Sequence, residues 1–188
     1  MCISKLTNDI FRDCKMLGKK GVESESILIN FEDVDFSAST VNGAKITNLS
    51  LKSGTTGYRI ESYKQLGGFS NAAVASADAQ EGFTHSITGR IEGSTLEASE
   101  RLKELQQGRF IQVVKTIFKG SNQEDEFKVL GFSNGLELSE STIVSNENNG
   151  NILFTMTTLD GNIEPYMYNV LLMGDSDSTK EAFDGLFA

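Results

Sequence analysis

Four Asn-Gly or Asp-Gly pairs, each between short apolar runs, constrain the fold of this chain more than any other feature. The pairs begin at Asn42, Asn134, Asn149 and Asp160. Asn, Asp and Gly tolerate the positive φ angles of tight hairpin turns, so such pairs favour antiparallel strands that are consecutive in the chain. A chain of 188 residues has room for one domain and is short for two. We therefore expect a single, mainly β domain.

Alternating and β-branched segments supply the strands of this domain. We expect strands at residues 26–32, 45–51, 57–63, 83–92, 110–118, 127–132, 136–138, 142–144, 152–159 and 167–173. The strongest is 110–118, because its β-branched and aromatic content is typical of a central strand. Polar residues 120–126 then turn the chain, which predicts a hairpin between 110–118 and 127–132.

One helix is predicted, at residues 95–107. Ser94 and Glu97 have the spacing of a capping box, in which the Ser94 hydroxyl accepts the backbone N–H of the third helical residue and the Glu97 carboxylate accepts that of the N-cap residue. Glu97 and Arg101 form a favourable i,i+4 pair, and Gly108 is placed to end the helix. The apolar stripe of this helix consists of Ala98, Leu102 and Leu105.

The chain divides into three parts around this β domain. We expect an N-terminal arm at residues 1–24, an antiparallel β-sandwich or small barrel at 25–174 with the helix on its flank, and an acidic tail or short helix at 175–188. Residues 65–82 are rich in Gly, Ala and Ser, which predicts a long loop inside the domain.

Composition excludes several kinds of chemistry. The chain has 17 Lys plus Arg against 26 Asp plus Glu, a net charge of -9, and therefore lacks the basic excess of a general binder of nucleic-acid phosphates. His85 is the only imidazole, and Cys2 and Cys14 are the only thiols. This is too few for a four-ligand zinc site, so we expect no metal and no cofactor. We expect two reduced thiols, with a Cys2–Cys14 disulfide left open.

Targeting signals are also lacking in the sequence. No continuous apolar segment follows Met1, and no run approaches the roughly 20 apolar residues of a membrane-spanning helix. We therefore expect neither a secretion signal nor contact with a membrane.

The chain contains no catalytic motif, and we expect it not to be an enzyme. His85 lies in an alternating segment with no G-x-S-x-G motif in the chain, which indicates a structural or surface histidine. Paired carboxylates could serve a hydrolase, at Asp33 and Asp35 or at Glu124 and Glu126, but solvated turn charge explains them more simply. An alternative function is a β-barrel carrier whose cavity is lined by some of the 12 Phe and binds a small apolar ligand.

Short motifs follow one another through the chain: DIFRDCK at residues 9–15, GRFIQVV at 108–114, FKVLGFSNGLEL at 127–138, NGNILFTM at 149–156 and EPY at 164–166. In this order they resemble a family of virion proteins from phages of gut Bacteroidetes, including the crAss-like group. Such proteins resemble tail-tube and tail-ring components, which are β-sandwiches or small barrels with one flanking helix. The chain departs from that pattern where it is Asn-rich, at 146–149, and at 65–82.

The resemblance implies a structural virion protein that forms a homo-oligomeric ring of the phage tail or head–tail connector. It implies neighbouring tail or portal-connector proteins as partners, and DNA that passes through the lumen without specific binding. The protein would assemble in the host cytoplasm and reside in the virion tail. We expect subunit-interface residues on the strands and the long loop, at Phe69, Val74, Phe110 and Phe118. The motifs carry over no catalytic, cofactor-binding or metal-binding residue.

The acidic charge has two interpretations under this hypothesis. It provides ordinary solubility, or it forms an inner wall that repels DNA phosphates and lets the genome slide.

Overall fold

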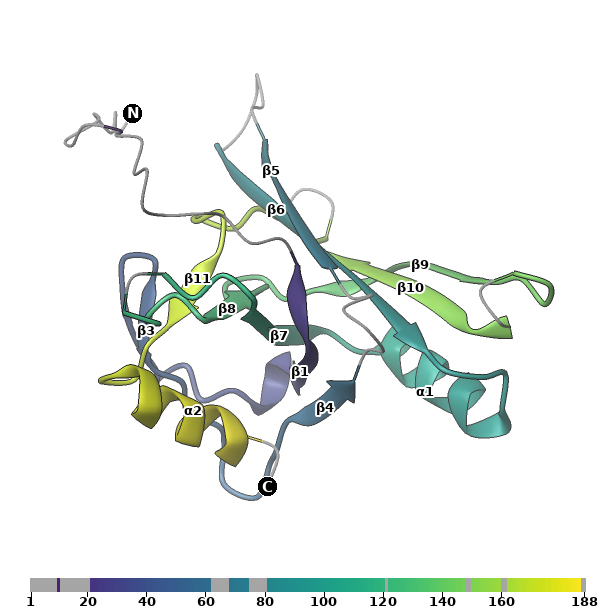
Figure 1. The fold of residues 1–188 in the computed structure, drawn as a ribbon, viewed down its shortest axis with the longest axis horizontal. Coiled ribbons are helices and arrows are strands. Elements are labelled where there is room, and N and C mark those ends of the chain that lie inside the picture. The colour runs from purple at the N-terminus through teal and green to yellow at the C-terminus, as the bar shows by residue number, and fades with distance from the viewer. Residues whose placement is uncertain are drawn as a thin grey trace.

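The computed structural model describes residue 10 and residues 21–61, 68–74, 81–120, 122–147, 150–159 and 162–186. Within these ranges the chain forms two β-sheets and two α-helices (Figure 1). The expected mainly β fold with a flanking helix is confirmed. The two sheets form an open sandwich, and the described strands do not close a barrel.

The larger sheet has seven strands in the order β2-β3-β11-β8-β7-β1-β4. Their bounds are β2 Thr40–Asn42, β3 Lys45–Asn48, β11 Asn169–Leu171, β8 Phe127–Leu130, β7 Phe110–Thr116, β1 Val22–Asn30 and β4 Tyr58–Glu61. All neighbours are antiparallel except β11 and β3. The predicted hairpin from 110–118 to 127–132 is confirmed as β7 and β8.

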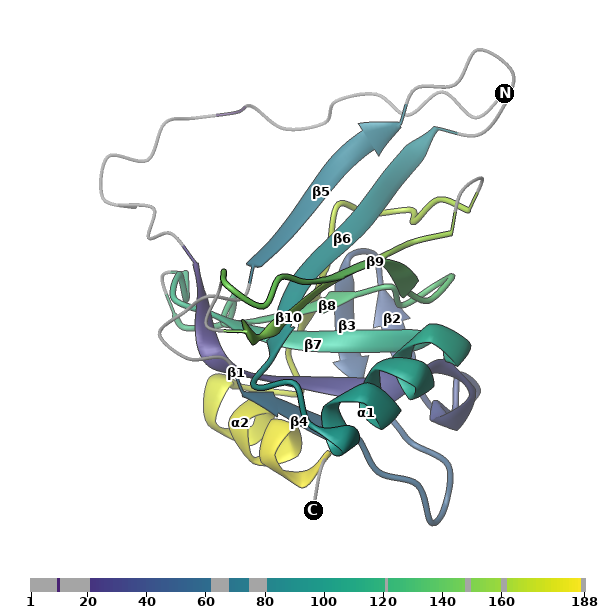
Figure 2. The same cartoon turned by 90° about the vertical axis from the view of Figure 1, so that its right-hand side faces the viewer.

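The smaller sheet has four strands in the order β5-β6-β10-β9, all antiparallel. Their bounds are β5 Gly68–Val74, β6 Gly82–Ile91, β10 Ile152–Thr157 and β9 Glu137–Ile143. β9 is one continuous strand where two short strands were expected, at 136–138 and 142–144. Figure 2 shows β5 and β6 as a long hairpin that leans across the other strands.

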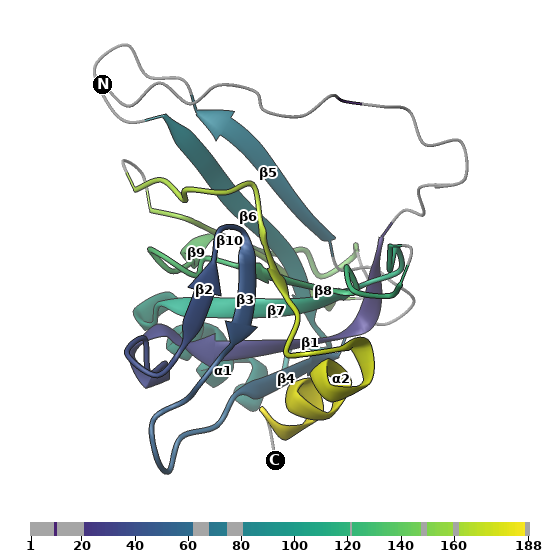
Figure 3. The same ribbon diagram turned by 90° about the vertical axis from the view of Figure 1, so that its left-hand side faces the viewer.

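Two apolar layers hold the sheets and helices together. The inter-sheet core lies between the sheets and consists of Val22, Leu28, Ile87, Phe110, Val114, Leu130, Leu136, Phe154 and Met156. A second core covers the other face of the larger sheet, where helix α2 (Ser176–Gly185) packs (Figure 3). There the rings of Phe127 and Phe183 lie 4.8 Å apart. Of residues 175–188 the structure describes 175–186, in which helix α2 occupies Ser176–Gly185; a short helix was one of the two expectations for this segment.

Helix α1 spans Leu96–Gln107, close to the predicted range. Ala98 is buried, and Leu102 and Leu105 pack against the inter-sheet core, as the stripe predicted. The predicted N-cap at Ser94 is wrong by one residue. Thr95 has the extended backbone of an N-cap, and its Oγ1 accepts the backbone N–H of Ala98 at 3.1 Å.

Two other expectations need correction. The predicted loop at 65–82 contains strand β5, and the predicted arm at 1–24 ends earlier because β1 begins at Val22. Both segments pair with a neighbouring strand along their backbones, which their small or polar side chains do not signal. Residues 62–67 and 75–80, in and next to the predicted loop, and residues 1–9 and 11–20 of the predicted arm lie outside the described residues. Both cysteines fall within the latter ranges.

The Asn-Gly pairs differ in what they connect. Asn42-Gly43 joins the antiparallel strands β2 and β3, and Gly43 has a φ of 61°. Gly150 lies in the β9–β10 hairpin, whereas Asp160 and Gly161 lie outside the described residues. Asn134-Gly135 does not make a hairpin, because it connects β8 of the larger sheet to β9 of the smaller one.

Neither described helix is long and apolar enough to cross a membrane.

Candidate assembly surface and inter-sheet clefts

Within the described residues, strand β5 is an open edge of the smaller sheet without the usual protection. It pairs residue for residue with β6, from Gly68 opposite Thr88 to Val74 opposite Gly82, and no bulge interrupts the register. Its sequence GFSNAAV contains no charged residue and no proline. Because proteins commonly blunt exposed edges with Lys, Pro or bulges, an unprotected edge of seven residues is suited to pairing with another chain.

The opposite edge of the smaller sheet is strand β9. It is also seven residues long, and most of its residues are exposed. A register shift separates the pairs made by Thr155 and Met156 of the neighbouring strand β10. In the part of the chain that the structure describes, the smaller sheet therefore has two open edges, one on each side, as a head-to-tail assembly of identical subunits requires.

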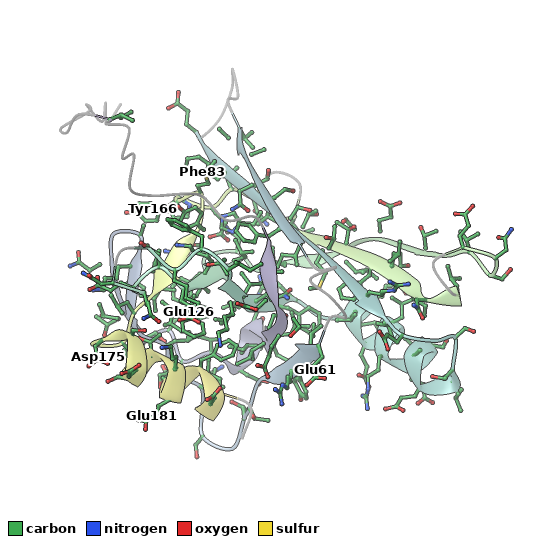
Figure 4. All side chains as sticks on the ribbon, in the orientation of Figure 1. Glu61, Phe83, Glu126, Tyr166, Asp175 and Glu181 are labelled. Carbon is green, nitrogen blue, oxygen red and sulfur yellow. The ribbon has the colours of Figure 1, made fainter. Side chains whose placement is uncertain are left out.

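The far ends of β5 and β6 extend beyond the rest of the two sheets (Figures 2 and 3). Along the edge of β6 that faces away from β5, Phe83 exchanges two backbone hydrogen bonds with Glu164, at 2.8 and 2.9 Å. Figure 4 shows Phe83 and Tyr166 in this part of the molecule. The hairpin is thus fixed to the body near one end, while β5 is unpaired along its outer side within the described residues.

Hydroxyl side chains dominate the outer face of the smaller sheet. Because side chains alternate along a strand, buried His85 and Ile87 place Ser86 and Thr88 on the opposite, outer face. Cross-strand register puts further residues on this face: Ser70, Thr84, Thr142, Thr155 and Thr157, with the acids Glu137 and Glu140 on β9. This face therefore carries mostly hydroxyl groups, with the acids along the β9 edge and the cation of Arg90 opposite exposed Leu153 near one end.

The inner face of β6 carries a buried polar junction. Gly131 donates its backbone N–H to Nδ1 of His85 at 3.0 Å, so the ring proton is on Nε2, which donates to the carbonyl of Tyr166 at 2.9 Å. Burial lowers the pKa of His85, and the attraction of nearby Glu164 only partly opposes this. His85 is therefore buried with both ring nitrogens hydrogen-bonded, and these contacts join the two sheets.

The four suspected interface residues lie in different places. Phe69 on β5 and Phe118 beyond β7 are half-buried and line one cleft. Val74 lies at the far end of β5. Phe110 is buried in the inter-sheet core, where its ring packs over Gly108, and so it serves the interior of its own subunit.

Two clefts open between the sheets. The first has a volume of about 380 Å³ and lies between Phe69, Phe118, Tyr168 and Lys128. The second has a volume of about 700 Å³ and lies between β4 and α1, with an apolar floor that includes Ile60, Phe110 and Phe154. The first cleft opens beside the start of β1, at Gly21 and Val22, and the second opens beside β4, at residues 58–61.

The candidate carboxylates of a hydrolase have local structural contacts. Asp33 accepts a hydrogen bond from Asn30, and Asp35 accepts three from Ser37 and Ala38. These bonds lower the pKa of Asp35. Glu126 is fully buried, with Lys119 at 2.8 Å and Lys115 at 3.6 Å, while Glu124 is exposed (Figure 4 labels Glu126).

The sequence reasoning missed Lys128 and Tyr168, which line the first cleft. A signal was present, because the run 127–132 is otherwise apolar and its alternation places Lys128 on the same side of β8 as Leu130.

No protein-family model, curated protein or solved structure matches this chain. The geometry and chemistry of these surfaces are therefore the basis for assigning a function.

Proposed function

We propose that this protein is a structural virion component that forms a homo-oligomeric ring of a phage tail or head–tail connector. The observation that carries the proposal is the four-stranded sheet with two open edges, of which β5 has no protecting charge, proline or bulge. In the ring, β5 of one subunit pairs with β9 of the next, so every edge of this sheet is covered. The motifs that resemble Bacteroidetes phage virion proteins support the same assignment.

The outer face of the smaller sheet supports a role as a passive conduit. Among the described residues of this face Arg90 is the one cation, so a lumen wall of hydroxyl groups bordered by Glu137 and Glu140 provides no cluster of cations to hold phosphates. In this proposal DNA passes without specific binding, and the neighbours of the ring are other tail or portal-connector proteins. The ring assembles in the host cytoplasm and resides in the virion tail.

Edge-blocking variants test the proposed pairing. Ala72→Pro on β5 and Thr142→Pro on β9 each introduce a residue that cannot donate a backbone hydrogen bond. Each is expected to abolish rings in native mass spectrometry, whereas Ala72→Ser and Thr142→Ser preserve them. Ala72→Lys serves as a second blocking variant if the proline prevents folding, as monitored by circular dichroism.

Mixing the two blocked variants tests whether the contact is head-to-tail. Each variant keeps one intact edge, so the mixture is expected to form a heterodimer and nothing larger. Rings that persist in either single variant would contradict the proposed β5–β9 contact. Failure of the mixture to form any dimer would contradict it as well.

A second candidate function is the binding of a small apolar ligand. The specific observation in its favour is the cleft of about 700 Å³ with an apolar floor, within the size range of about 300–1,000 Å³ of ligand sites. The closed barrel of the original alternative is not formed by the described strands. Saturable binding of decanol to the wild type, lost on Ile60→Asp and retained in Leu153→Asp on the outer face, would favour this function.

A further inference from the structure

Lys128 is buried between the sheets with little to neutralise its charge. Its side chain is 8% exposed, and its Nζ lies 3.5 Å from Oδ1 of Asp125, at the outer limit of a hydrogen bond. The ring of Tyr168 lies 4.6 Å from the ammonium group and contributes a cation–π contact. Since an ammonium has three donors and burial of a charge is costly, the described residues leave this group under-satisfied.

The ammonium group lies at a cleft and not in a sealed core. The cleft of about 380 Å³ is lined by Lys128 and Asp125 and by the rings of Phe69, Phe118 and Tyr168. Phe69 comes from the smaller sheet, while Phe118 and Tyr168 flank strands of the larger sheet. The cleft thus combines apolar walls from both sheets with one buried cation.

The charges in the cleft select the kind of anion it suits. The carboxylate of Asp125, itself 44% exposed, stands beside the ammonium and would repel a doubly charged group such as a phosphate. A single negative charge approaching from the cleft side supplies Lys128 with a strong acceptor. The aromatic walls then contact an attached ring or alkyl chain.

We infer that this cleft is a binding site for a small monocarboxylate with an aromatic or short alkyl body, whose carboxylate is bound by Lys128 and whose body lies between Phe69 and Phe118. The site can be tested on a monomer, because the residues named here form the cleft within one chain, although Phe69 belongs to β5, the strand proposed to pair in the ring. Burial lowers the pKa of Lys128, and an adjacent carboxylate counteracts this by stabilising the charged form.

Matched probes test the inference on the full chain. Calorimetric titration with 3-phenylpropanoate is expected to give a dissociation constant below about 1 mM. The neutral 3-phenylpropanamide and acetate, which lack the charge and the apolar body respectively, are each expected to bind at least about tenfold more weakly. Equal binding of the acid and its amide, or no binding of the acid, would overturn the inference.

Variants locate the binding site. Lys128→Met keeps an unbranched side chain without charge and is expected to weaken 3-phenylpropanoate binding at least about tenfold. Lys103→Met, on the exposed face of α1, is the matched control and is expected to bind as the wild type does. Phe69→Ser leaves the cation in place and removes one wall, which keeps the inference testable if Lys128→Met does not fold.

The outcomes separate this site from the proposed assembly. Ligand binding that persists in the monomeric Ala72→Pro variant supports the site whatever becomes of the ring. Unchanged ligand binding in Lys128→Met would overturn the site. Loss of rings in Lys128→Met, with no binding of the acid by the wild type, would assign the ammonium to a subunit contact instead.

Discussion

Nδ1 of His85 accepts the backbone N–H of Gly131 at 3.0 Å, and this contact joins the smaller sheet to the end of β8 in the larger one. Nε2 of the same ring donates to the carbonyl of Tyr166, so both nitrogens are used. Beside it, the carboxylate of Glu164 accepts the backbone N–H groups of Ser133 and Asn134 at 3.0 and 2.8 Å. The neutral imidazole is therefore part of the structure that holds the two sheets together.

Protonation of His85 is expected to destabilise the fold. Its pKa is lowered by burial, so the unfolded chain takes up a proton at a higher pH than the folded chain. The stabilisation is fully present above the ordinary pKa of about 6.5 and is lost as the pH falls toward the lower folded-state pKa. The free energy of unfolding should decrease from pH 7.5 to 5.5, by no more than about 1.4 kcal/mol per pH unit.

The control for this pH dependence is unusually clean, because the chain has one histidine. Urea unfolding of His85→Gln over the same range should show a flatter dependence on pH, since glutamine does not titrate. A wild-type protein whose stability rises on acidification over that range would contradict the burial argument. A variant with the same slope as the wild type would do so too.

Buried Glu126 connects the β7–β8 turn to helix α2. It lies 2.8 Å from Nζ of Lys119 and 4.0 Å from Nζ of Lys180, which belongs to α2. We expect Glu126→Gln to lower the free energy of unfolding by about 2 kcal/mol, because the buried side chain no longer pairs with the lysines around it. The loss is not larger because these partly exposed lysines can turn to solvent. Glu124→Gln, two residues away and exposed, should change it by less than about 0.5 kcal/mol in the same denaturation experiment.

The apolar face of α1 gives a second matched pair of substitutions. Leu102→Asp places a charge against the inter-sheet core and should destabilise the protein by about 3 kcal/mol or prevent folding. Leu96→Asp makes the same change at a residue that is 78% exposed in the first turn, where an acid is favourable. Equal melting temperatures for the two variants would show that the buried face of the helix is assigned wrongly.

Where local pattern and tertiary contact agree, the fold could be predicted from the sequence. Residues 110–118 and the helix at 95–107 have strong periodicity, and both are found close to their predicted bounds. Strand β5 was missed because Gly68, Ala72 and Ala73 have weak strand propensity, and only the backbone pairing with β6 makes this segment a strand. The N-cap shifted from Ser94 to Thr95 because either hydroxyl can cap, and the packing of α1 decides between them.

The clefts could not be predicted, because they depend on how far the two sheets separate. Phe69 and Lys128 are on different sheets, and no spacing in the sequence places them together. Asn134-Gly135 shows the same limit, since its turn chemistry was recognised but not the change of sheet that it makes. Short-range patterns therefore predicted elements, and the relation between the sheets came only from the structure.

The central claim is that subunits join through the edges of the four-stranded sheet to form a closed ring. Electron microscopy of the purified full-length protein tests this most directly. The account predicts closed rings of one symmetry, with β5 of each subunit beside β9 of its neighbour. A protein that stays monomeric over its accessible concentration range, or that forms particles with both of these edges exposed to solvent, would contradict it.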